Sequence, residues 1–257
     1  MYGAIFGDIA GSAYEFHPTH DYNFDLITQD SMFTDDTICT MAIADAFMNG
    51  RPYRTSLLSW CSAYPHPMGG YGGRFYEWLH SKNPTAYYSW GNGSAMRVSA
   101  LGWLCSDLDE TFQEATYSAA CTHNHPDAIR GAQAVAAAVY LARTGVCKDV
   151  ILKFVEQTFC YDLSGDLSIF RGKFDESCNG TVPAAFLCIR DSHDFESAIR
   201  LAVSLGADAD TLGAIVGAIA EPLYGMPDEY KAIVRDFLES EPQMLEVLQQ
   251  FKERIKV

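Results

Sequence analysis

Apolar residues recur at helical spacing along most of the chain, and strand-like alternation of apolar and polar residues is rare. Residues three and four positions apart lie on one face of an α-helix, so such a pattern predicts a helix with one buried face. Asp194 stands before the first of the clearest segments, where it can cap a helix. These segments are Phe195, Ala198, Ile199 and Ala202; Tyr230, Ile233, Val234 and Phe237; and Met244, Leu245, Leu248 and Phe251.

Two other segments are apolar on nearly every side. Residues 131–143, GAQAVAAAVYLAR, predict a central buried helix. Residues 1–16, MYGAIFGDIAGSAYEF, predict a first core helix rather than a signal peptide, because no basic region precedes the apolar run. No run approaches the roughly 18 apolar residues of a membrane span. We therefore expect an all-α fold, and the eight scattered cysteines indicate a reducing, cytoplasmic location.

Residues 64–95 differ from the rest of the chain. They are rich in Gly, Pro, Tyr and Asn, and their pattern predicts no long helix. Long irregular segments within compact domains are usually functional. We expect this segment to contribute to a site.

The composition is that of a globular protein, with 48% apolar and 20% charged residues in a chain of 257. No repeat or linker interrupts it, so we expect a single domain over residues 1–257. The 33 acidic residues outnumber the 18 basic ones, giving a net charge of −15. Such a balance argues against nucleic acid as the main ligand. The eight cysteines include no Cys-x-x-Cys pair, so neither a zinc site nor a disulfide framework is expected.

Two short acidic motifs stand directly before apolar helical runs. TDDT covers residues 34–37, and ADADT covers residues 207–211. One interpretation is helix capping, since Asp and Thr are preferred at helix N-termini. Asp208 and Asp210 face the same side only if the chain there is extended, which predicts that the helix opens at Thr211. Capping, however, needs fewer carboxylates than these motifs supply.

The second interpretation is a metal site. If the two motifs meet in space, four carboxylates crowd together and cannot all stay ionised without a cation. Ligand sets made only of carboxylate, hydroxyl and water oxygens favour Mg²⁺ or Mn²⁺ over zinc. Two divalent ions would roughly neutralise the cluster.

TDDT and GADADT together resemble motifs of the ADP-ribosylglycohydrolase family, which includes the dinitrogenase-reductase-activating glycohydrolase and the ADP-ribosyl-acceptor hydrolases. Ala207 and Ala209 depart from the usual Gly-Gly-Asp-Thr/Ser-Asp-Thr pattern, at positions that supply no metal ligand. The other resembling segments follow in the family's order: GDIAGSAYEF (7–16), GYGGRF (70–75), GNGSAMR (91–97), THNHPDA (122–128) and CNGTVPAAF (178–186).

The resemblance implies a compact, all-α orthogonal bundle with a binuclear magnesium cleft, and it assigns residues to roles. Glu15 matches the family glutamate that approaches the metals, and the alternative for this residue is an ordinary surface glutamate at the end of a helix. The implied metal ligands are Thr34, Asp35, Asp36, Asp208, Asp210 and Thr211. The implied catalytic residues are Asp35, Asp36, Asp208 and Glu15, and the implied substrate-binding residues are Gly70, Tyr71, Gly72, Gly73, Asn92, Gly93, Ser94 and His123.

Some of these residues also have structural interpretations. For the glycine-rich segment alone, a mobile turn is the more common explanation, and Tyr71 and Phe75 are suited to core packing as well as to a sugar or adenine ring. We interpret His125, before Pro126, as structural, and Arg97 as a partner of a nearby carboxylate.

The activity implied is magnesium-dependent hydrolysis of the glycosidic bond between ADP-ribose and its acceptor, a protein side chain or small molecule, reversing ADP-ribosylation. Two alternatives remain at this stage. One is a member of the same fold that binds ADP-ribose without cleaving it, and the other is a magnesium-dependent phosphohydrolase. The sequence does not identify the acceptor.

Overall fold

The computed structural model describes residues 1–255, so the last two residues of the predicted domain, 256–257, lie outside the described part. In residues 1–255 the chain forms α-helices joined by loops, with two short 3₁₀ turns at Asn92–Ser94 and Leu167–Phe170. The helices are α1 (Tyr2–Ser12), α2 (Asp35–Met48), α3 (Tyr53–Ala63), α4 (Gly73–Leu79), α5 (Ser99–Leu104), α6 (Leu108–Ala120), α7 (Pro126–Arg143), α8 (Lys148–Phe159), α9 (Cys178–Asp191), α10 (Phe195–Ser204), α11 (Ala209–Tyr224), α12 (Asp228–Phe237) and α13 (Pro242–Arg254).

The all-α prediction is confirmed. The described residues contain no β-sheet, and their only strand-like pairings are isolated bridges between Thr34 and Met68 and between Gly91 and Ser177. The helices predicted from periodicity correspond to α1, α7, α10, α12 and α13. Asp194 caps α10 as expected, accepting a hydrogen bond from the backbone N–H of Ser197. The segment 64–95 is mostly irregular, but it contains the seven-residue helix α4.

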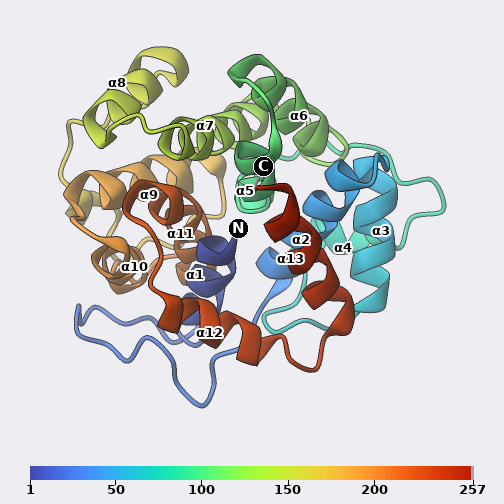
Figure 1. Ribbon diagram of the computed structural model, residues 1–257, viewed down its shortest axis with the longest axis horizontal. Coiled ribbons are helices and arrows are strands. Elements are labelled where there is room, and N and C mark those ends of the chain that lie inside the picture. The colour runs from blue at the N-terminus through green and yellow to red at the C-terminus, as the bar shows by residue number, and fades with distance from the viewer. Residues whose placement is uncertain (256–257) are drawn as a thin grey trace.

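Helices α1 and α11 lie together near the middle of the molecule, with the other helices around them (Figure 1). Their backbones are in close contact because glycines face one another along the pair. A Cβ added at Gly7 would lie 1.9 Å from the carbonyl oxygen of Gly213, and one added at Gly3 would lie 2.2 Å from that of Gly217. No side chain fits there without moving a helix, so the glycines set the distance between α1 and α11.

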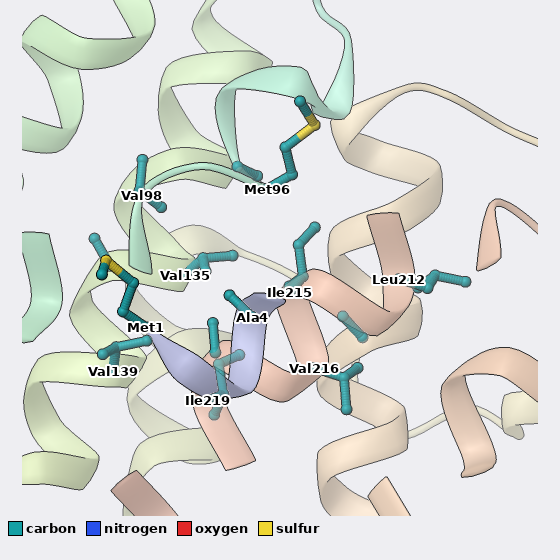
Figure 2. Close-up of a cluster of buried hydrophobic side chains, with 14 of the residues drawn as sticks. Met1, Ala4, Met96, Val98, Val135, Val139, Leu212, Ile215, Val216 and Ile219 are labelled. Atoms are coloured by element: carbon teal, nitrogen blue, oxygen red, sulfur yellow. The ribbon is translucent and has the colours of Figure 1, made fainter. Parts of the chain in front are cut away.

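Apolar side chains of α11 fill the space between this pair and the neighbouring helices. Figure 2 shows Ile215 and Ile219 of α11 beside Ala4 of α1, with Val135 of α7 close by. All four side chains are buried. Apolar burial of this extent holds α11 rigidly, because core side chains pack at crystal-like density. The N-terminal end of α11 therefore belongs to a rigidly packed helix.

Within residues 1–255, none of the helices combines the length and the apolar character that crossing a bilayer requires.

Candidate active site

The first carboxylate of the site belongs to α1. Asp8 is fully buried, and its side chain accepts hydrogen bonds from residues at the beginning of α2. Thr34 donates through its hydroxyl at 2.7 Å and its backbone N–H at 3.0 Å. Thr37 donates through its backbone N–H at 3.1 Å and also through its hydroxyl. Asp8 thus attaches the N-terminus of α2 to the middle of α1.

Asp8 forms a cluster with Asp36 of α2 and Asp210 of α11. One carboxylate oxygen from each lies within 4.8 Å of the other two, and all three residues are buried. The hydroxyl of Thr211 donates to Oδ2 of Asp36 at 3.3 Å. The other oxygen of Asp36, Oδ1, is buried without a hydrogen-bond partner among the described residues. Segments from three distant parts of the sequence therefore meet at one carboxylate cluster.

The N-terminus of α11 differs from the prediction. The helix begins at Ala209, not at Thr211, and Asp208 is its N-cap residue. The aspartates nevertheless converge, because Asp208 has non-helical backbone angles (φ −74°, ψ 85°) and Asp210 lies in the first turn. The Asp208 side chain makes no capping bond and instead accepts a hydrogen bond from the amide of Asn92 at 2.7 Å. Capping therefore does not explain Asp208.

Capping does account for part of the role of Thr34. Its hydroxyl accepts a hydrogen bond from the backbone N–H of Asp36 at 3.2 Å while donating to Asp8. Asp35 and Asp36 follow in the first turn of α2. Asp35 is the partly exposed member of this pair.

Burial and neighbouring carboxylates raise the pKa values of Asp8, Glu15, Asp35, Asp36 and Asp208. Burial, reinforced by Asp210, raises the pKa of Asp8 to about 7. Burial together with Asp210 also raises the pKa of Glu15, to about 8. For Asp36 and Asp208, burial and the neighbouring carboxylates hold the pKa well above the ordinary range. The pKa of Asp35 is raised by burial and then by Cys39 and Asp210.

These features fit a divalent cation. The carboxylates are too close to ionise together in isolation, and no cationic side chain pairs with Asp8 or Asp36 among residues 1–255. A buried carboxylate oxygen without a partner, such as Oδ1 of Asp36, is costly unless a ligand satisfies it. Oε2 of Glu15 is a second such atom. The all-oxygen donor set suits Mg²⁺ or Mn²⁺.

The raised pKa values predict a pH dependence of stability in the metal-depleted protein. Each carboxyl group keeps its proton to higher pH in the folded than in the unfolded state, so the folded state loses stability as pH rises. The loss should begin near pH 4, the ordinary range, and continue through about pH 7 and about pH 8, the pKa values of Asp8 and Glu15. Melting temperatures measured at pH 5 and pH 8 with chelator test this. A melting temperature in chelator that is higher at pH 8 than at pH 5 would contradict it.

A cavity of about 480 Å³ opens beside the carboxylates. Its lining includes Asp35, Asp36, Asp208, Asp210, Thr211 and Glu15. It also includes the backbone of the glycine-rich segment, where Gly69 and Gly70 have positive φ angles of 77° and 82°. Arg74, Arg97 and His123 also line it, so the lining includes both acidic and basic residues.

The structure brings most of the predicted substrate-binding residues to this cavity. Gly70, Tyr71, Gly72, Gly73, Asn92, Gly93 and His123 all line it. Ser94 does not, because it is fully buried and its hydroxyl donates to the carbonyl of Ala128 at 2.9 Å. Thr34 is also fully buried and does not line the cavity, and its hydroxyl donates a hydrogen bond to the carboxylate of Asp8. The roles of these residues stay predictions.

The hydrogen bonds of His125 and Arg97 test the interpretations drawn from the sequence for these two residues. His125 is the N-cap of α7, and its ring accepts a hydrogen bond from the backbone N–H of Asp127, which is a structural role. Arg97 was expected to pair with a carboxylate, and this was wrong. Its guanidinium donates to the carbonyl of Ser118 and the hydroxyl of Thr122, and it forms no ion pair within residues 1–255.

The model of the family described as ADP-ribosylglycohydrolase matches residues 1–255. The chain belongs to the ADP-ribosylglycohydrolase family. ADP-ribosylarginine hydrolase Tri1 of Pseudomonas putida (strain GB-1) is 25% identical over 272 residues, covering 90% of this chain and 71% of that protein. ADP-ribosylhydrolase ARH3 of Mus musculus is 25% identical over 324 residues, covering 93% of this chain and 87% of that protein.

A solved structure described as an ADP-ribosylglycohydrolase-related protein complex shares the fold of this family member. The TM-score is 0.73 at 22% sequence identity, and the match covers 97% of this chain and 95% of the other. The all-α bundle inferred from the sequence is therefore the fold of the family.

Asp8 is the residue of this family member that the sequence analysis missed. It stands alone in an apolar helix, without a neighbouring polar residue that would mark it as part of a site. A signal was present, since an ionisable residue surrounded by core residues on every side is rare unless it is paired or coordinates a metal. Its partners, Thr34 and Thr37, are 26 and 29 residues away, so the contact required the folded structure.

Proposed function

We propose that the protein is a magnesium-dependent hydrolase that cleaves the glycosidic bond between ADP-ribose and its acceptor. The observation that carries this proposal is the convergence of Asp8, Asp36 and Asp210, from three helices, beside a cavity with a glycine-rich wall. The relatives support it, because both are named as hydrolases of ADP-ribose linkages. We further propose a single domain over residues 1–257 and a cytoplasmic location.

The carboxylate cluster would hold the cation. We propose two divalent ions, because two would roughly neutralise the charge of the carboxylates. The six ligands implied by the resemblance are proposed here as well: Thr34, Asp35, Asp36, Asp208, Asp210 and Thr211. We add Asp8, whose carboxylate lies in the same cluster as those of Asp36 and Asp210. A bound divalent cation would act as a Lewis acid towards the oxygens of the ribose attached to the acceptor.

Proton transfer and substrate binding would be carried out by groups of the protein itself. Asp35, Asp36 or Asp208 would accept the proton of the attacking water, and Asp35 is the partly exposed one of the three. Asn92 fixes the orientation of Asp208 through its amide, which also donates to Thr181 at 3.0 Å. The backbone amides of residues 69–73 would bind the diphosphate, since glycine allows close approach of the backbone to an anion. Such local anion binding is compatible with a net charge of −15.

Two alternatives share this geometry. A protein that binds ADP-ribose without cleaving it would not need a crowded carboxylate cluster with an unpartnered oxygen on Asp36. A phosphohydrolase would use the same cation on the diphosphate rather than on the ribose. The products distinguish all three.

We expect incubation with arginine-linked and serine-linked ADP-ribosyl peptides in the presence of Mg²⁺ to release intact ADP-ribose from at least one of them. Mass spectrometry of the products and of the peptide provides the test. Release of orthophosphate or AMP would favour the phosphohydrolase, and tight ADP-ribose binding without any product would favour the binding protein.

A further inference from the structure

Arg97 and Thr122 form a hydrogen-bonded chain that ends at His123, a residue that lines the cavity. Nη2 of Arg97 lies 2.9 Å from Oγ1 of Thr122, and this oxygen lies 2.7 Å from Nδ1 of His123. The exposed fraction of these residues is 1%, 0% and 6%, so water does not compete for the bonds. Each bond therefore constrains the next.

The direction of donation along these hydrogen bonds follows from Arg97. A guanidinium has only donors, so Oγ1 of Thr122 must accept from Arg97 and has its own proton to donate. Two acceptors are within reach of that proton: the carbonyl oxygen of Ala119 at 3.4 Å and Nδ1 of His123 at 2.7 Å. The second distance is typical of a strong hydrogen bond, and the first is near the limit. The hydroxyl therefore donates to Nδ1, which must carry a lone pair.

The ring of His123 is neutral at physiological pH. Burial and the nearby cations Arg97 and Arg74 lower the pKa of His123 well below its ordinary value. A neutral imidazole carries one proton, and with Nδ1 acting as an acceptor that proton is on Nε2.

Nε2 faces the ligand cavity. A Cβ added at Gly93 would lie 3.3 Å from Nε2, and one added at Gly91 would lie 3.4 Å from it, so the ring nitrogen faces two glycines that line the cavity. The small size of both residues leaves the nitrogen open to a bound molecule.

We propose that Arg97 and Thr122 are positioning residues that hold His123 in the Nε2–H tautomer, so that its ring presents a hydrogen-bond donor to an oxygen of the ligand. The identity of that ligand as ADP-ribose rests on the function proposed above. Without the chain, His123 would also sample the Nδ1–H tautomer, and Nε2 would then turn a lone pair towards the ligand oxygen. Arg97 makes no hydrogen bond to His123 itself, and it fixes the tautomer by setting the direction of the Thr122 hydroxyl.

The tautomer is measurable in the free protein by ¹H–¹⁵N correlation spectroscopy of the histidine rings, with His123 assigned by its loss in His123→Gln. We expect the Nε2–H form in the wild type and in Thr122→Ser, which keeps the hydroxyl. Thr122→Val removes the hydroxyl at nearly constant volume, so we expect a mixture of tautomers. If that variant does not fold, Thr122→Ala replaces it.

Calorimetric titration with ADP-ribose gives the second readout. Affinity should fall by about tenfold in Thr122→Val, the effect of one hydrogen bond, and recover in Thr122→Ser. An Nδ1–H tautomer in the wild type would overturn the proposal, as would an unchanged tautomer and affinity in Thr122→Val. If the wild type bound no ADP-ribose, the proposed function would fail, while the tautomers would still decide whether the chain acts on His123.

Discussion

Replacing Asp36 by Asn is expected to lower turnover by about a hundredfold or more and, in metal-depleted protein, to raise the melting temperature. Asp36 is 2% exposed, and burial, Asp210 and Asp8 raise its pKa. Asn has nearly the same shape but no charge, so it relieves the repulsion while weakening the cation site. Losses of this size are usual when a group that acts in the transition state is removed. Steady-state kinetics and thermal melts with chelator measure both effects.

Asp45 on the same helix provides the matched control. It is also buried, at 6% exposed, but it is well partnered, with Arg51 at 2.9 Å and the indole N–H of Trp60 at 3.0 Å. Asp45→Asn should therefore lower the melting temperature and leave kcat close to the wild-type value. Wild-type turnover by purified Asp36→Asn would show that the acidic motif of α2 serves helix capping alone.

The second large effect is expected from Gly217→Leu, which should lower the free energy of unfolding by more than about 3 kcal/mol. A Cβ at this position would lie 2.0 Å from the carbonyl oxygen of Gly3, before any larger side chain is considered. The helices α1 and α11 must then separate. Because α1 carries Asp8 and α11 carries Asp210, the affinity for Mg²⁺ should fall as well.

Chemical denaturation and calorimetric titration with Mg²⁺ measure these two quantities. Gly165→Ala is the control, since a Cβ there meets only Ile169, at an ordinary contact distance of 3.8 Å. A variant with lowered stability but unchanged Mg²⁺ affinity would show that the spacing of α1 and α11 does not position the site.

The sequence predicted the helices whose apolar periodicity is clear, because that periodicity reports burial directly, but it did not predict α3 to α6, α8 or α9 individually. The segments around Ile199, Val234 and Leu248 each became one helix with the expected buried face. Helix α11 begins two residues before the predicted start at Thr211, because the two aspartates can converge without both preceding the helix. An N-cap residue and a residue of the first turn can also converge, as Asp208 and Asp210 do.

The candidate site was predictable only where neighbouring residues carried the signal. TDDT and ADADT are each visible as short local motifs, and their similarity to one another suggested a shared site. Asp8 and the chain from Arg97 to His123 depend on contacts between distant segments or on the geometry of a loop. A lone arginine gives no indication of its partner, which is why Arg97 was assigned to a carboxylate instead of to Thr122.

The central claim is that the carboxylates gathered by α1, α2 and α11 hold a divalent cation that is required to cleave an ADP-ribose linkage. The most direct test is the rate of ADP-ribose release from an ADP-ribosylated peptide, measured after metal removal and during titration with Mg²⁺. We predict no release in excess chelator and full recovery as Mg²⁺ is restored. Full turnover in chelator, with metal removal verified by elemental analysis, would contradict the account.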